Sequence, residues 1–490
     1  MNENKGKSLG KNAILNVIKQ ACSIIFPFIS FAYCSRRLGK EALGAYSFGQ
    51  SIISYLLLIA TLGITNYAIR EGAIVRDNSK KLHIFINQVF SINVVMTIVS
   101  YIVMVVLLIF NKKIGSYGIV IIIQSLQIIL TTLGADWINS IFEDYFYIAV
   151  RYIIVQAIAL VCLFIFVNDP SDLYIYTFIS MMSNAGGNLF NIYYLRKKGI
   201  SPRFTFRLNL SKHLAPIIIL FANSVASVIY LNSDITMIGF LIDDGATGVY
   251  TVSTKIYSMI KALINALVMV TVPRFSYYLA HDMKDEYRHT LSRIFASLFV
   301  ITLPIMIGLY LEAYKILEVV AGSSYYSGES VVRILSLAIF FATMSCFFSY
   351  GILLPNRLEK YFLLSTSVAA ISNVSLNFIF IPIWGINGAA LTTLLAEIIV
   401  FTITAICSYK TVRFEISKKN VFSVSIASAL LGVICTLLDK LTINDFFVLA
   451  LDVLMGALTY FGSLLIMKNA IVLGICEQIK GKLIHKRKVQ

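Results

Sequence analysis

The sequence has little charge for its length. Asp, Glu, Lys and Arg make up only 13% of its 490 residues, whereas 58% of the residues are hydrophobic. A soluble globule of this size needs a much larger polar surface than this composition can supply. The composition therefore excludes a soluble globular domain.

The residue patterns that bind metals, nucleotides or reacting groups are also missing. The seven cysteines are scattered without a C-x-x-C pair, and none of the five histidines is spaced with a carboxylate like a metal ligand set. The sequence has no G-x-x-x-x-G-K-[ST] loop for a nucleotide. We therefore expect no catalytic residues, no metal and no cofactor, and we expect that the protein is not an enzyme.

Long apolar stretches dominate the sequence instead. About fourteen of them are long enough to cross ~30 Å of hydrocarbon as helices that rise 1.5 Å per residue. Their approximate positions are 12–34, 44–67, 82–110, 118–139, 152–168, 174–194, 216–241, 250–272, 294–314, 332–353, 362–383, 387–408, 421–437 and 446–467. This pattern predicts an all-α, polytopic membrane protein with about 14 transmembrane helices.

The basic residues predict how these helices are oriented. With the N-terminus in the cytoplasm, thirty of the 41 Lys and Arg fall on the inner side, eight outside and three within spans. This is the positive-inside pattern. We therefore expect that the protein lies in the cytoplasmic (inner) membrane and that both of its termini are in the cytoplasm. The net charge of +16 is explained by loops that face anionic lipid, and we expect no nucleic-acid partner.

Two short matches indicate an internal duplication. Residues 42–46 (ALGAY) resemble residues 246–250 (ATGVY), and residues 143–146 (EDYF) resemble residues 359–362 (EKYF). Both matches map the first six helices onto the next six. Because six is an even number, the two halves would share one orientation, as in parallel-repeat transporters.

These observations predict two pseudo-symmetric six-helix bundles and two extra helices. The expected divisions are an N-terminal bundle over 1–195, a cytoplasmic linker over 196–215 and a C-terminal bundle over 216–410. Residues 411–490 would form the two additional helices and a basic cytoplasmic tail.

Several segments resemble bacterial polysaccharide flippases, the Wzx-type branch of the multidrug/oligosaccharidyl-lipid/polysaccharide exporter superfamily. The resemblance covers essentially the whole chain and is carried by residues 37–46, 63–71, 134–137, 234–239, 248–255 and 272–276. It implies twelve core helices in two bundles around a central cavity.

The same resemblance implies a function in cell-surface polysaccharide biosynthesis (capsule, O-antigen or exopolysaccharide). A flippase of this branch moves a polyprenyl-pyrophosphate-linked oligosaccharide from the inner to the outer leaflet by alternating access. The implied partners are the lipid-linked oligosaccharide, membrane lipid, a polysaccharide polymerase and a chain-length regulator. The alternatives are a cation-coupled multidrug exporter and a flippase for the peptidoglycan lipid precursor.

Charged residues inside the predicted spans are the candidate site residues, since a charge at mid-bilayer costs about 2.5–3.5 kcal/mol or more. Lys261 and Glu397 both lie near mid-membrane, either as a cavity cation with a coupling site or as a buried ion pair. Lys255 and Asp234 lie at matching depths, either as a salt bridge or with Lys255 at the cavity rim. Lys19 either contacts cargo or snorkels to the headgroups.

Charges at the ends of spans are further candidates. Arg36 and Arg37 stand on the outer side against the positive-inside trend, so they either contact phosphate on release or are solvated loop residues. Arg70 and Glu71 either form an inner gate or a boundary ion pair. Asp136 and Trp137 are typical of an interfacial anchor.

Overall fold

Helices account for nearly all of the structure. The computed structural model describes the backbone of residues 9–415, 417–440, 444–474 and 476–477, and their side chains except those of residues 9–21, 211, 212, 215, 219, 220 and 223. Within these residues there is no strand. Twelve candidate membrane spans are found when the bent N-terminal helix counts once and the interrupted segment 173–197 is left out. If the bent helix is counted as two spans and segment 173–197 is included, the number of spans is the predicted fourteen.

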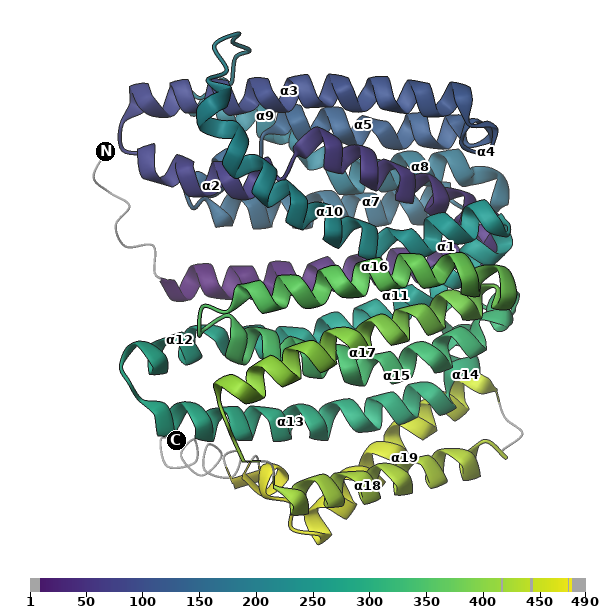
Figure 1. Cartoon of the computed structure of the whole chain (residues 1–490). Helices are drawn as coiled ribbons and strands as arrows, with labels where there is room; N and C mark the ends of the chain where they lie inside the picture. Colours follow the sequence, from purple (N-terminus) through teal and green to yellow (C-terminus); the bar gives the residue numbers. More distant parts are fainter. Residues whose placement is uncertain (1–8, 416, 441–443, 475, 478–490) are drawn as a thin grey trace, which may run out of the picture. The chain divides into compact units, whose positions relative to one another are not determined.

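The chain divides into two compact units, Met1–Gly248 and Val249–Gln490. In unit 1 the long helices pack side by side with short helices at their ends (Figure 1). Its elements are α1 (Leu9–Thr61), α2 (Ile64–Val75), α3 (Ser79–Phe110), α4 (Lys112–Ser116), α5 (Gly118–Gly134), α6 (Trp137–Ile141), α7 (Tyr145–Phe166), η1 (Pro170–Asp172), α8 (Leu173–Met181), η2 (Met182–Gly186), α9 (Gly187–Lys197) and α10 (Leu210–Leu241).

Unit 2 is built from the elements after this boundary, which falls inside α11. Its elements are α11 (Asp244–Met269), α12 (Val272–Ala280), α13 (Lys284–Leu311), α14 (Ala313–Ala321), η3 (Ser323–Gly328), α15 (Glu329–Phe347), η4 (Phe348–Leu353), α16 (Glu359–Trp384), α17 (Ile386–Thr411), α18 (Lys418–Leu438) and α19 (Asp445–Ile466). The helices α18 and α19 pack on each other, and α18 also packs on α13. The predicted bundle boundary at 196–215 stays a prediction.

Long and short helices follow the same order in both halves, which confirms the predicted pseudo-symmetry. The second half of α1 leads to α2, α3, α4, α5 and α7, as α11 leads to α12, α13, α14, α15 and α16. Residues with positive φ separate these elements where a helix must stop, namely Leu62, Gly63 and Gly385. Gly39, at φ 75°, bends α1 between its two predicted spans.

A reciprocal close approach joins α1 to the first turn of α11, inside unit 1. A Cβ at Gly44 would overlap the carbonyl oxygen of Asp244, and a Cβ at Gly248 would overlap the carbonyl oxygen of Lys40. Gly44 and Gly248 are 204 residues apart in the sequence, and so are Lys40 and Asp244. The contact is therefore symmetric with respect to the duplication, and both glycines are required by it.

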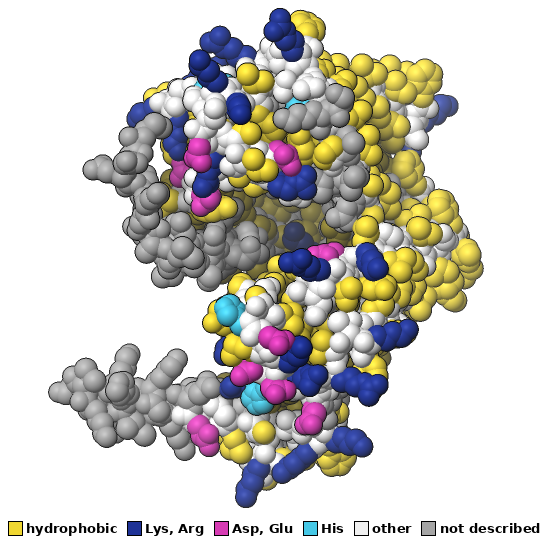
Figure 2. Space-filling view, turned by 60° about the vertical axis from the view of Figure 1, so that its left-hand side comes forward, with side chains coloured by type: hydrophobic (Ala, Val, Ile, Leu, Met, Phe, Trp, Pro, Cys, Tyr) yellow, Lys and Arg dark blue, Asp and Glu magenta, His cyan; other side chains and the backbone are white. Residues whose placement is uncertain are grey.

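The surface has the distribution expected of helices in a lipid bilayer. In Figure 2, hydrophobic side chains cover much of the helix flanks, and the Lys, Arg, Asp and Glu side chains gather where the helix ends come forward. Many large apolar side chains on α3 and α7 are exposed, among them Ile98, Ile102 and Ile158. Such flanks are stable against hydrocarbon and not against water.

Candidate functional site

Lys261 and Glu397 meet inside unit 2. Lys261 lies on α11 and Glu397 on α17, and the Lys261 ammonium forms an ion pair with Oε1 of Glu397. Tyr257 donates its hydroxyl to the same oxygen at 2.8 Å. The Glu397 side chain is only 4% exposed, whereas that of Lys261 is 26% exposed. The carboxylate is thus buried, and the amine is the more exposed partner of the pair.

Sequence reasoning missed Tyr257. It precedes Lys261 by one helical turn, at the i,i+4 spacing that places two side chains on one face. The chain thus supplies two donors, the Tyr257 hydroxyl and the Lys261 ammonium, to a single buried acceptor.

Asp234 and Lys255 are on different units. Asp234, on α10 of unit 1, is 8% exposed, and Lys255, on α11 in unit 2, is half-buried. Both take part in polar or electrostatic contacts. The proposed salt bridge between them stays a prediction, as does a cavity role for Lys255.

The remaining predicted residues lie on other helices than the Lys261–Glu397 pair. Arg36 and Arg37 are exposed on α1 just before the bend, and the Arg37 guanidinium lies 5.6 Å from the centroid of the Tyr33 ring. Arg70 pairs with its neighbour Glu71 at 3.1 Å on the short helix α2, and both are partly exposed. The side chain of Lys19 lies outside the described residues.

The expectation of an interfacial anchor at Asp136 and Trp137 is wrong for the tryptophan. Trp137 is 5% exposed and begins α6 within unit 1, among the buried core residues of α2 and α3. Asp136 forms a 2.8 Å ion pair with Arg151 of α7. Because the indole is enclosed by protein, it cannot lie at the lipid headgroups.

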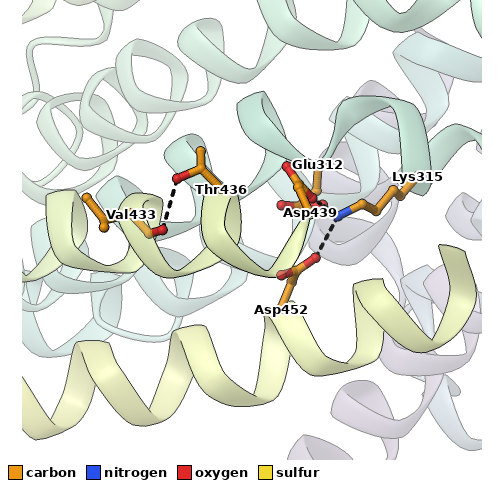
Figure 3. Close-up of polar contacts among 6 residues, drawn as sticks. All are labelled: Glu312, Lys315, Val433, Thr436, Asp439 and Asp452. Carbon is orange, nitrogen blue, oxygen red and sulfur yellow. Dashed lines mark hydrogen bonds and ion pairs between the residues drawn. The ribbon is translucent and has the colours of Figure 1, made fainter. Parts of the chain in front are cut away.

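A further charged cluster that the sequence did not predict lies between α14, α18 and α19. Figure 3 shows Glu312, Asp439 and Asp452 around the ammonium of Lys315. The distances from the Lys315 nitrogen are 2.7 Å to Glu312 and 2.8 Å to Asp452, and Asp439 also forms an ion pair with it. Sγ of Cys435 lies within 4.8 Å of the Glu312 and Asp452 oxygens.

Burial gives this cluster its electrostatic character. The side chains of Glu312, Lys315 and Asp452 are 4%, 12% and 1% exposed, so these charges are largely shielded from water. Because the ammonium already bridges the carboxylates, we interpret the cluster as an ion-pair network that joins α18 and α19 to α14 within unit 2.

Comparison with known proteins adds a relationship over most of the chain. Residues 9–279 match the family described as polysaccharide biosynthesis protein. A protein of Escherichia coli K12 named "Putative O-antigen transporter" is 22% identical over 82% of this chain and 96% of its own length. A protein of Haloferax volcanii named "Probable flippase AglR" is 26% identical over 46% of this chain and 48% of its own length.

Among solved structures, a lipid II flippase in an inward closed conformation has a TM-score of 0.73. It is 17% identical and covers 95% of this chain and 99% of that one. At this identity the likeness shows the fold alone.

Proposed function

The chain belongs to the polysaccharide biosynthesis protein family, and we propose that it moves lipid-linked oligosaccharides across the cytoplasmic membrane. The cargo would be a polyprenyl-pyrophosphate-linked repeat unit, carried from the inner to the outer leaflet. The observation that supports this most strongly is the match over nearly the full length of an O-antigen transporter, 96% of that protein. The proposed activity is translocation, which breaks no covalent bond.

The need for such a protein follows from the cargo's chemistry. Each unpaired polar group of a sugar costs several kcal/mol in hydrocarbon, so the head group cannot cross ~30 Å of bilayer unaided. Two pseudo-symmetric units can alternate in exposing the head group to each side while the prenyl tail stays in lipid. Both termini would lie in the cytoplasm, and a polymerase and a chain-length regulator would take over the product.

Lys261 is the residue that we propose for contact with the anionic head group. Its ammonium is partly exposed while Glu397 behind it is buried, so cargo can approach the amine. A pyrophosphate would then compete with Glu397 for the ammonium. The binding of cargo would thereby break the ion pair between Lys261 and Glu397.

Proteoliposomes test the function directly. The purified protein should make a fluorescent lipid-linked oligosaccharide accessible to a lectin or to periodate on the opposite leaflet. Peptidoglycan lipid precursor and a lipophilic dye cation serve as competing cargoes. Transport of the cation or the precursor without the oligosaccharide would refute the proposal in favour of the corresponding alternative.

A mutant cycle tests the role of Lys261. Lys261→Ala should lower export per folded molecule, and Lys261→Arg should retain part of it; Lys410→Ala, on an exposed position of α17, is the control. If Lys261 only neutralises Glu397, the single variant should instead lose stability, by ~3–5 kcal/mol for a well-buried pair. Recovery of both stability and export in Lys261→Ala with Glu397→Ala would assign the residue to structure.

A further inference from the structure

A polar pocket of about 360 Å³ lies within unit 1, and the residues that line it include none of those discussed as a transport charge. Its lining comes from α2, α3, α6, α7 and α9 and includes Thr65, Asn93, Asp136, Trp137, Arg151 and Asn188. Thr65 is exposed at its rim, whereas Asn93, Trp137 and Arg151 are buried. We propose that this pocket binds a single sugar ring of the cargo, an inference that rests on the proposed function.

Arg151 is the central residue of the pocket. Its side chain is 10% exposed, and one of its nitrogens, Nη2, forms the ion pair with Asp136. The Nε and Nη1 groups are buried without a hydrogen-bond partner among the described residues. Because the guanidinium is planar, its N–H donors have a fixed geometry and cannot rotate toward water independently of one another.

Aromatic stacking holds this guanidinium in position. It lies 5.4 Å from the centroid of the Tyr147 ring, which stacks on Tyr194 at 3.6 Å. The Lys198 ammonium lies 4.5 Å from the centroid of the Tyr194 ring and forms an ion pair with Asp144. The orientation of Arg151 is thus set by the protein before any ligand binds.

Trp137 contributes a third unpaired donor. Its indole Nε1 is buried and has no hydrogen-bond partner within the described part of the chain. A buried donor left unpaired destabilises the folded protein, so native proteins rarely keep three in one pocket. A ligand with several acceptor oxygens would relieve that destabilisation.

The charge balance favours a sugar over a phosphate. Arg151 is already paired with Asp136, whose carboxylate is 42% exposed and lines the same pocket. A phosphate would meet this carboxylate with no excess positive charge to offset the repulsion. Sugar hydroxyls both donate and accept, so they suit Asp136 together with the arginine and tryptophan N–H groups.

Size and backbone geometry support the same conclusion. The volume is at the lower end of the ~300–1,000 Å³ of small-ligand sites, enough for one ring and too little for a repeat unit. The π-helical turn η2 borders the pocket, and Gln156 pairs with both the hydroxyl and the carbonyl of Ser183 there. Turns of this type occur frequently at functional sites.

The two tryptophans of the chain provide a test of binding. Trp384→Phe leaves Trp137 as the sole tryptophan, which is excited selectively over tyrosine at long wavelength; Trp384 is exposed, so the substitution should be tolerated. The purified full-length variant is titrated with glucose, galactose, N-acetylglucosamine, N-acetylgalactosamine and a uronic acid, up to roughly 100 mM each. We expect a saturable change in fluorescence with at least one sugar and none with inorganic phosphate or pyrophosphate.

Two substitutions then assign the signal to the pocket. Arg151→Lys keeps the charge beside Asp136 but loses the forked donors, and it should weaken sugar binding at least tenfold. Asn188→Ala keeps the Cβ that packs on Gly134 and should weaken it less. Arg76→Gln, on an exposed residue outside the pocket, should leave the titration unchanged.

The outcomes separate this proposal from the proposed function. Binding of phosphate or pyrophosphate without sugar, or no response to any sugar of the panel, would overturn the sugar pocket. So would normal oligosaccharide export by an Arg151→Lys protein that has lost sugar binding. Failure of the unmodified protein to move the oligosaccharide would refute the proposed function instead, whatever the fluorescence shows.

Discussion

Replacing Lys315 by Met should destabilise the protein strongly. The Lys315 side chain is 12% exposed, and its ammonium forms ion pairs with Glu312 and Asp452. The side chains of these two residues are 4% and 1% exposed. Removing one partner of a buried pair costs ~3–5 kcal/mol, because the remaining charge stays buried. At ~2–4 °C per kcal/mol for a domain of 150–250 residues, Tm should fall by roughly 6–20 °C.

The measurement is thermal unfolding of the purified protein in detergent. Lys440→Met, an exposed lysine beside Asp439, is the matched control and should behave like the unchanged protein. The triple change of Lys315→Met, Glu312→Gln and Asp452→Asn should recover most of the loss, since neutral residues of similar size are tolerated in place of buried ions. The reasoning is refuted if Lys315→Met unfolds at the same temperature as the control.

Three further changes are expected to give clear results. Gly44→Val should prevent the approach of α1 to Asp244 and so abolish the folded protein, seen as loss of a monodisperse peak in size-exclusion chromatography. Arg76→Gln should change stability by less than about 1 kcal/mol, because its partner Glu143 is 63% exposed; a larger shift in thermal unfolding would contradict this. Reporter fusions after Lys198 should read as cytoplasmic and those after Lys113 as outside, and an inversion of either would refute the fourteen-span topology.

The fold was predictable from the sequence because apolar length and charge distribution are strong, local signals. Each of the fourteen predicted stretches corresponds to a helix, to half of a bent helix or to a helical segment with a short interruption, such as 173–197. The duplication was visible at Gly44 and Gly248 because a close backbone approach admits only glycine there. Short helices such as α2 were missed because their apolar residues continue the hydrophobic pattern of the preceding span.

The polar contacts were harder to predict, since they depend on which helices become neighbours. Lys261 and Glu397 could be named as a pair from their depth alone, but Tyr257 could not be distinguished from the many other tyrosines. Arg151 was counted among inner-side charges, because a sequence does not show that a residue near a helix start faces the bundle interior. Trp137 was misassigned for the same reason.

The reciprocal contact between the two glycines has an evolutionary consequence. Gly44 approaches Asp244, and their counterparts in the duplication, Gly248 and Lys40, approach each other in the same way. Two identical subunits related by a two-fold axis form contacts of this reciprocal kind. The contact between α1 and the first turn of α11 has this form within a single chain, which is the contact expected between the two copies of a duplicated six-helix unit.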